Sequence, residues 1–208
     1  MTFFYIDTTS SYLYTGIVKD NNLISSSIKN LGRELSIYTV DEVNKMFLSV
    51  NLKPTDIDKI IVVNGPGSFT GIRIGVTLAK IMAWALDIPI ITITSLEAMA
   101  KSIKSDKLVV PIINARRDAC YAAIYDNNNV ILEGQYLKIE KLKMILTGLG
   151  KDYEFISNDK FDFNVVEYTP DILSIVDYYK DRECINPHLV NPVYLKLTEA
   201  EENRLNND

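Results

Sequence analysis

The sequence predicts an α/β protein made of two related lobes, and two observations carry this prediction. In the first half, runs of aromatic and β-branched residues alternate with segments of helical spacing, in the order βββαβαβ. In the second half, the pattern of strand, polar turn, strand, Asp-Asn turn and strand recurs about one hundred residues later. A duplicated βββα unit explains the repeat, and chance similarity between two hairpins is the alternative.

The first half opens with a predicted three-stranded meander. Its runs are separated by polar turns and cover residues 2–7, 12–18 and 23–28. Apolar residues then recur with helical spacing over residues 34–50, and Pro54 ends that helix. A strand, a helix and a further strand follow before another helix completes the lobe; they are expected over residues 59–64, 70–86 and 88–94.

The second half predicts a smaller, degenerate copy of this lobe. Its expected elements are strands over 109–113, 121–125 and 130–131, a helix over 140–146, a strand over 154–157 and a helix over 171–179. The predicted lobes are therefore residues 1–105 and 106–208, and the second ends in a polar tail at residues 199–208.

Charge argues against direct binding to nucleic acid. The 208 residues include 22 Lys and Arg against 27 Asp and Glu, which gives a net charge of −5. Residues 1–104 hold 10 basic and 9 acidic side chains, whereas residues 105–208 hold 12 and 18. No strong positive field draws this chain to RNA or to an anionic membrane, so unaided RNA binding is not expected.

A reduced, cytoplasmic setting is expected. Two cysteines, Cys120 and Cys184, are too few for a disulfide framework or a cysteine-ligated zinc site. The N-terminus has no basic and apolar leader, and Asp87 interrupts the apolar run at residues 81–93 well short of a membrane span. The single histidine, His188, weakens any catalytic or metal scheme based on histidine.

A glycine-rich motif joins the predicted strand 59–64 to the helix 70–86. It reads Gly65-Pro66-Gly67-Ser68-Phe69-Thr70-Gly71-Ile72-Arg73-Ile74-Gly75, with Ser68 or Thr70 as candidate N-cap. The glycines either leave backbone N–H groups and Arg73 free to bind an anion, or only permit tight turning and close packing. The motif fits neither nucleotide-loop fingerprint, and the packing interpretation is favoured.

The predicted helix 70–86 is apolar on nearly every side. Gly71, Gly75, Ala79 and Ala83 form one i, i+4 row, along which another backbone can approach closely. One side of the helix can pack on the sheet, and the helix 34–50 or a second protein chain can cover the other. The predicted partner-interface residues are Val40, Val43, Phe47, Ile72, Arg73, Val76, Leu78 and Lys80.

Two turns carry further candidate residues. Asp7 ends the first strand at a place similar to that of the phosphate- and metal-facing carboxylate of actin-like kinases, but the echoing residue in the second half is Asn114. Asp7 could instead hydrogen-bond its own turn through Ser10 or Ser11. Arg116 and Arg117 form a basic spot, which is either a solvated turn or a contact for a carboxylate or phosphate.

Motifs along nearly the whole chain resemble the bacterial TsaB (YeaZ) family. They are Asp7-Thr8-Thr9-Ser10, the glycine-rich motif 65–75, Ala79-Lys80, Ile88-Pro89, Thr94-Ser95-Leu96, Ala115-Arg116-Arg117 and Pro192-Val193-Tyr194-Leu195. The resemblance implies an actin-like ATPase (ASKHA, RNase H-like) fold of two lobes. It also implies a role in making N6-threonylcarbamoyladenosine in tRNAs that read ANN codons, as the catalytically silent relative and binding partner of TsaD.

Silence is also expected from the residues. TsaD-type relatives carry a metal-binding His-x-x-x-His on the helix after the strand that corresponds to 90–94, and the matching residues here are Ser95 and Met99. Two further departures from the family pattern are Asn114, where an Asp is usual, and residues 32–35, which lack the common His-Ser.

The expected function is therefore a non-catalytic scaffold that binds and stabilises TsaD, with TsaE as a further partner. We expect a homodimer when the protein is alone, no metal and no tightly bound cofactor. ATP or ADP and tRNA would be engaged only by the assembled complex. The alternative is an enzyme: an ATP-dependent phosphotransferase, or a peptidase as the older glycoprotease name of the family suggests.

Overall fold

The predicted meander forms one side of a five-stranded mixed sheet. In the computed structural model, which describes residues 1–196, this sheet has the order β3-β2-β1-β4-β5. In the meander, β2 pairs antiparallel with both β1 and β3. Strand β1 also pairs in parallel with β4, and β4 pairs in parallel with β5. The strands are β1 (Thr2–Asp7), β2 (Tyr12–Lys19), β3 (Asn22–Asn30), β4 (Lys59–Val63) and β5 (Ile90–Ile93).

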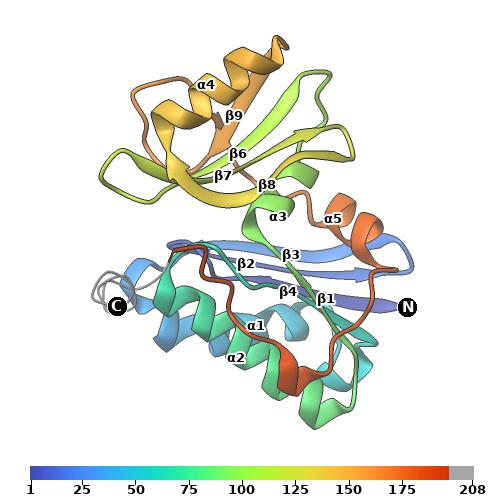
Figure 1. Cartoon of the computed structure of the whole chain (residues 1–208). Coiled ribbons are helices and arrows are strands. Elements are labelled where there is room, and N and C mark those ends of the chain that lie inside the picture. The colour runs from blue at the N-terminus through green and yellow to red at the C-terminus, as the bar shows by residue number, and fades with distance from the viewer. Residues whose placement is uncertain (197–208) are drawn as a thin grey trace. The chain divides into compact units, whose positions relative to one another are not determined.

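Helices cover both faces of this sheet. Figure 1 shows α1 (Leu35–Ser49) and α2 (Phe69–Leu86) on one face, and α3 (Ser95–Lys101) and α5 (Ile172–Tyr179) on the other. Strand residues alternate between the two faces, and those facing α1 and α2 form the main core with them. Short 3-10 helices occur at Gly32–Glu34, Pro54–Asp56 and Pro187–Leu189.

One side of α1 enters the core, and it includes the apolar residues Val43 and Phe47 of the predicted helix 34–50. Val40 of the same predicted helix is 61% exposed, and Ile37 and Leu48 are exposed as well. These side chains stay outside the core because α1 carries apolar residues on more than one side and only one side faces the sheet. The buried residues of α1 are Leu35, Thr39, Val43, Met46 and Phe47.

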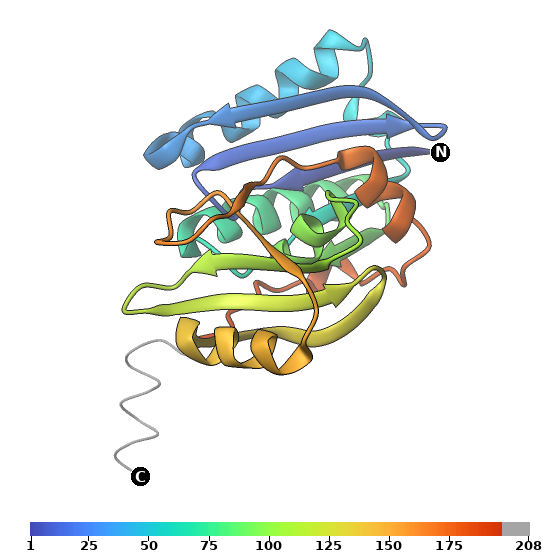
Figure 2. The same ribbon diagram turned by 90° about the horizontal axis from the view of Figure 1, so that it is seen from above.

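A second five-stranded sheet repeats the first. Its order is β10-β9-β6-β7-β8, with an antiparallel meander from β6 to β8 and parallel pairing of β6 with β9 (Figure 2). The predicted repeat of two related sheets is therefore confirmed. The elements are β6 (Leu108–Asn114), β7 (Ala119–Asp126), β8 (Asn129–Lys138), α4 (Ile139–Leu149), β9 (Tyr153–Ser157) and β10 (Val166–Glu167).

The chain divides into two compact units that are not simple halves. Unit 1 contains Met1–Lys104 and Tyr168–Pro192, and unit 2 contains Ser105–Glu167 with the described residues from Val193 onward. The sequence analysis placed all of 106–208 in the second lobe, whereas residues 168–192 return to unit 1. The predicted polar tail 199–208 lies outside the described residues.

Packing explains why the segment 168–192 belongs to unit 1. Ile172 of α5 lies over Gly16 of β2, where a Cβ atom would come within 2.8 Å of the Ile172 side chain. Arg182 donates hydrogen bonds to the Thr92 carbonyl and to Glu97. These contacts join the segment to β2, β5 and α3 of the first sheet.

By length and composition alone, α2 could cross a membrane. Core helices of soluble proteins pass the same test, and α2 packs as one: Ile72, Val76, Ala79 and Ala83 are buried in the core of unit 1. This packing accounts for the apolar residues on one side of α2.

Candidate functional site

The glycine-rich motif forms a tight junction between β4 and α2. The Gly65-Pro66 peptide bond is cis, and Ser68 caps α2 by accepting a hydrogen bond from the Gly71 N–H. Ser68 is thus the N-cap, one of the two candidates named from the sequence.

The glycines of the motif leave space for the turn that follows β1 to pack against α2. A Cβ atom at Gly67 would collide with the carbonyl of Thr9, and Cβ atoms at Gly71 and Gly75 would collide with Thr8. Two hydrogen bonds of 2.7 Å join the elements, from the Ser68 N–H to the Thr9 carbonyl and from the Thr8 hydroxyl to the Gly71 carbonyl. The approaching backbone is therefore the 8–10 turn, and the geometry supports the packing interpretation of the motif.

Asp7 is buried at the end of β1. One carboxylate oxygen accepts hydrogen bonds of 2.8 Å from both the N–H and the hydroxyl of Thr9. Burial raises the pKa of Asp7 to about 6, although the two bonds from Thr9 act in the opposite direction. The suggested partners Ser10 and Ser11 were wrong; Ser10 accepts a hydrogen bond from the Tyr12 N–H instead.

Residues at the positions of the histidine pair serve packing. Ser95 and Met99 of α3 are both buried, and the Ser95 hydroxyl donates to the carbonyl of Pro66. A hydroxyl engaged in this way and a thioether form a poor ligand set for iron or zinc. Within residues 1–196, no group of three His, Cys, Asp or Glu side chains is placed to hold a metal ion.

Four predicted interface residues are core residues instead. Val43, Phe47, Ile72 and Val76 are all at most 6% exposed and belong to the core cluster of unit 1. They lie between the two helices and the sheet, so they cannot contact another chain while unit 1 is folded. A charged substitution at Val76 would therefore disrupt folding of unit 1 and could not report on binding to a partner.

The remaining predicted interface residues differ in accessibility. Val40 and Arg73 are exposed, while Leu78 is half-buried and packs against the core. The Lys80 ammonium group donates to the carbonyls of Val190, at 2.7 Å, and His188, at 3.3 Å. Lys80 thus attaches the returning segment to α2 and is not directed at a partner.

The outer sides of α1 and α2 expose large apolar side chains, of which the sequence analysis chose only Val40. Ile81 and Trp84 of α2 are 56% and 66% exposed, and Ile37, Val40 and Leu48 of α1 are exposed to a similar degree. We call these five residues the helix-face patch. Ile81 and Trp84 lie three positions apart, a spacing that could have marked them as one exposed side of α2.

In unit 2, the β6–β7 turn is held in an uncommon conformation. Arg116, Arg117 and Asp118 all have positive φ, between 51° and 64°. The Asn114 side chain accepts from the Arg116 N–H at 2.8 Å, and Lys138 donates to the Arg117 carbonyl at 2.7 Å. Asn114 therefore has a local structural role as the residue that closes this turn.

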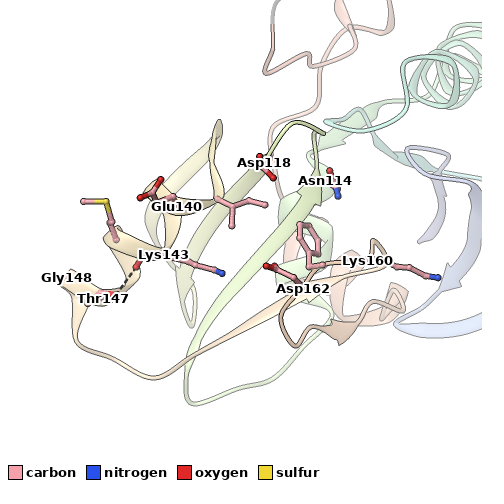
Figure 3. A pocket seen from close by; sticks show the side chains of 11 residues that line it. Asn114, Asp118, Glu140, Lys143, Thr147, Gly148, Lys160 and Asp162 are labelled. Carbon is pink, nitrogen blue, oxygen red and sulfur yellow. Dashed lines mark hydrogen bonds between the residues drawn. The ribbon is translucent and has the colours of Figure 1, made fainter.

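An open groove lies beside this turn. Its volume is about 1210 Å³, and Figure 3 shows it between α4 and the loop after β9, with Lys143 and Asp162 projecting toward one another. Both acidic and basic side chains line it, so its charge favours no particular ligand. The lining residues are Asn114, Asp118, Ile139, Glu140, Lys143, Met144, Thr147, Gly148, Lys160, Phe161 and Asp162.

Comparison with known proteins shows the family to which this chain belongs. A family model described as TsaD, tRNA N6-adenosine threonylcarbamoyltransferase, matches residues 30–175. The tRNA threonylcarbamoyladenosine biosynthesis protein TsaB of Bacillus subtilis is 33% identical over 97% of this chain and 96% of its own length. The chain belongs to the TsaB family. This family takes part in threonylcarbamoyladenosine biosynthesis, as the resemblance implied.

Two further comparisons agree with the TsaB assignment. The TsaB protein of Buchnera aphidicola subsp. Schizaphis graminum is 26% identical over 74% of this chain and 76% of its own length. A crystal structure from Pseudomonas aeruginosa, described as an uncharacterized protein with similarity to the peptidase YEAZ, superposes with a TM-score of 0.81. It is 20% identical, covers 94% of this chain and 99% of its own, and so establishes the TsaB fold. The predicted α/β class with two related sheets is thereby confirmed.

Proposed function

We propose that this TsaB-family protein is a non-catalytic subunit that binds and stabilises TsaD in the complex that forms N6-threonylcarbamoyladenosine in tRNA. The proposal includes TsaE as a further partner and a cytoplasmic location. In this proposal the protein has no tightly bound cofactor of its own. ATP or ADP and tRNA bind to the assembled complex. The observation that carries the proposal is the helix-face patch.

The patch has the character of a protein-binding surface. The opposite sides of α1 and α2 already form the core of unit 1, so the large apolar side chains of the patch do not contribute to that core. Large apolar side chains that are exposed together are typical of protein-binding surfaces. Trp84 is the only tryptophan, and an exposed tryptophan next to an isoleucine has the composition of an interface hot spot. In the absence of TsaD, we propose that the same patch pairs two copies of the chain about a two-fold axis.

The candidate catalytic positions support a scaffold better than an enzyme. Ser95 and Met99 are buried packing residues, and Asp7 is bonded to its own turn. Asn114, the counterpart of Asp7, binds backbone in its turn. This arrangement leaves no pair of carboxylates for phosphoryl transfer and no histidine pair for activating water.

Titration calorimetry of TsaD with this protein tests the proposal. Wild-type protein should bind, and Trp84→Ser and Ile81→Ser should each weaken binding at least tenfold, because they remove large apolar side chains from the patch. Sedimentation of the same variants alone should show loss of the homodimer.

Met144→Ser is the matched control, since Met144 is 69% exposed on α4 of unit 2. It should bind TsaD as the wild type does. If both patch variants bind TsaD like the control, the patch is not the interface. ATPase turnover by the isolated protein that Asp7→Ala abolishes would return the enzyme hypothesis to first place.

A further inference from the structure

The geometry points to a device that the proposed function does not require: Asp7 makes the junction between β1 and α2 a proton-linked hinge. The junction opens more readily when the Asp7 carboxyl group is ionised and closes when it is protonated. Three features of unit 1 lead to this inference, namely the enclosure of Asp7, its connection to α2, and the absence of a compensating cation among the described residues.

Asp7 is enclosed without a positive charge. The ionisable side chains around Asp7 are phenols. Tyr5 on the same strand and Tyr168 after β10 both interact electrostatically with the Asp7 carboxylate. Tyr14 lies opposite Asp7 in the β1–β2 pairing. Burial raises the pKa values of Tyr5 and Tyr168 well above 10, so both stay neutral in ordinary buffers. Within residues 1–196, Asp7 takes part in no salt bridge, and its hydrogen bonds come from Thr9.

The charged side chains of the neighbouring helices are engaged elsewhere or exposed. On α3, Glu97 pairs with Arg182, and the Lys101 ammonium lies over the Tyr178 ring at 3.6 Å. On α2, Arg73 is exposed with its guanidinium 5.9 Å from the Phe69 ring centroid. These elements leave the charge of ionised Asp7 uncompensated.

A short series of bonds connects Asp7 to the start of α2. The carboxylate binds Thr9, the Thr9 carbonyl accepts from the N-cap residue Ser68, and the neighbouring Thr8 hydroxyl binds Gly71. The Cβ positions of Gly67, Gly71 and Gly75 are occupied by Thr8 and Thr9, so the turn and the start of α2 are in direct contact. Separating the turn from α2 breaks the two hydrogen bonds that join them.

Linkage sets the direction of the effect. The pKa of Asp7 is about 6 in the closed junction, against its ordinary value of 3.8 when solvated. Because the closed form holds the proton more tightly, ionisation favours the open form. The opening constant should rise with pH above about 4, and level off above about pH 6 at about a hundredfold its low-pH value.

Hydrogen exchange at pH 5 and pH 7.5, corrected for the intrinsic exchange rates, tests the hinge in the full chain. In the wild type, the protection factors of the amides of Thr9, Ser68 and Gly71 should be about tenfold lower at pH 7.5. Asp7→Asn keeps an acceptor oxygen but cannot ionise, so its protection at these amides should not depend on pH. Amides of β7 should show no such difference in either protein.

Asp58→Asn is the matched control, because Asp58 accepts a 2.6 Å hydrogen bond from the Thr2 N–H at the other end of β1 but is exposed. It should leave the pH dependence at the junction as in the wild type. Equal protection at the two pH values in the wild type, or the same fall in Asp7→Asn, would overturn the proposal. If Asp7→Asn does not fold, a carboxyl-carbon NMR titration of the wild type decides, since titration of Asp7 below pH 5 would also overturn it.

Discussion

At the scale of single residues, the packing of glycine against threonine decides how closely α2 approaches β1. The approach depends on missing Cβ atoms at Gly67, Gly71 and Gly75, each of which faces Thr8 or Thr9. Gly67 has a φ of 157°, which also favours glycine. The motif is therefore explained by the turn it accommodates, without a bound anion.

We expect Gly75→Ala to destabilise the protein by about 1 to 3 kcal/mol, because the added methyl group must displace the Thr8 hydroxyl. Gly148→Ala is the matched control within α4, where a Cβ atom would meet no atom within 4 Å. It should stabilise by up to about 1 kcal/mol, because alanine favours helix. Urea unfolding with unchanged m-values measures both. Equal effects of the two substitutions would refute the close-packing explanation.

At the scale of elements, the segment from Ile185 to Asn191 acts as a strap across unit 1. Ile185 pairs with Ile90 of β5, the Asn64 side chain donates to the Asn191 carbonyl, and Val190 is buried in the core. Lys80 adds two bonds from α2 to this strap. The strap thus connects α2 to β5.

We expect Lys80→Met to loosen the strap, because the thioether keeps the side-chain length but cannot donate to the two carbonyls. Hydrogen exchange of residues 185–191 should become faster, and stability should fall by about 1 kcal/mol. Lys45→Met is the control, since Lys45 lies exposed on α1 and pairs with Glu42 of the same helix. Unchanged exchange in the strap would show that Lys80 does not hold it.

At the scale of the whole molecule, charge opposes direct binding to tRNA. The chain carries −5, and residues 105–208 carry 12 basic against 18 acidic side chains. Phosphate binding depends on clustered lysine and arginine, and each contact adds to the salt dependence. Arg116 and Arg117, on their shared turn, are the residues best placed to form an exception.

We expect labelled tRNA titrated with this protein alone at moderate salt to show no micromolar binding, and binding to appear when TsaD is added. The reason is that, in the proposed function, this chain favours the competent state of TsaD and does not contact phosphate. Micromolar binding by the protein alone, lost in an Arg116→Ala/Arg117→Ala variant, would establish direct RNA contact.

Local periodicity was sufficient to predict the elements and the repeat. Strands β1 to β7 and β9 and helices α1, α2, α4 and α5 lie where the sequence placed them to within a few residues, because a period of two or of 3.6 is a property of neighbouring residues. Strand β8 was expected over residues 130–131 but extends to Lys138. The two-residue strand β10 was missed, since two residues carry no period. The row Gly71 to Ala83 likewise predicted a close approach to another backbone.

Only the tertiary structure decided what each surface contacts. Periodicity states which residues share a side of α1, but not which of its apolar sides meets the sheet, so Val43 and Phe47 are core while Val40 is exposed. It cannot show that Lys80 binds a strap more than one hundred residues away, or that Asp7 is buried. These outcomes depend on which distant segments pack together, because burial and electrostatic environment are properties of the folded chain as a whole.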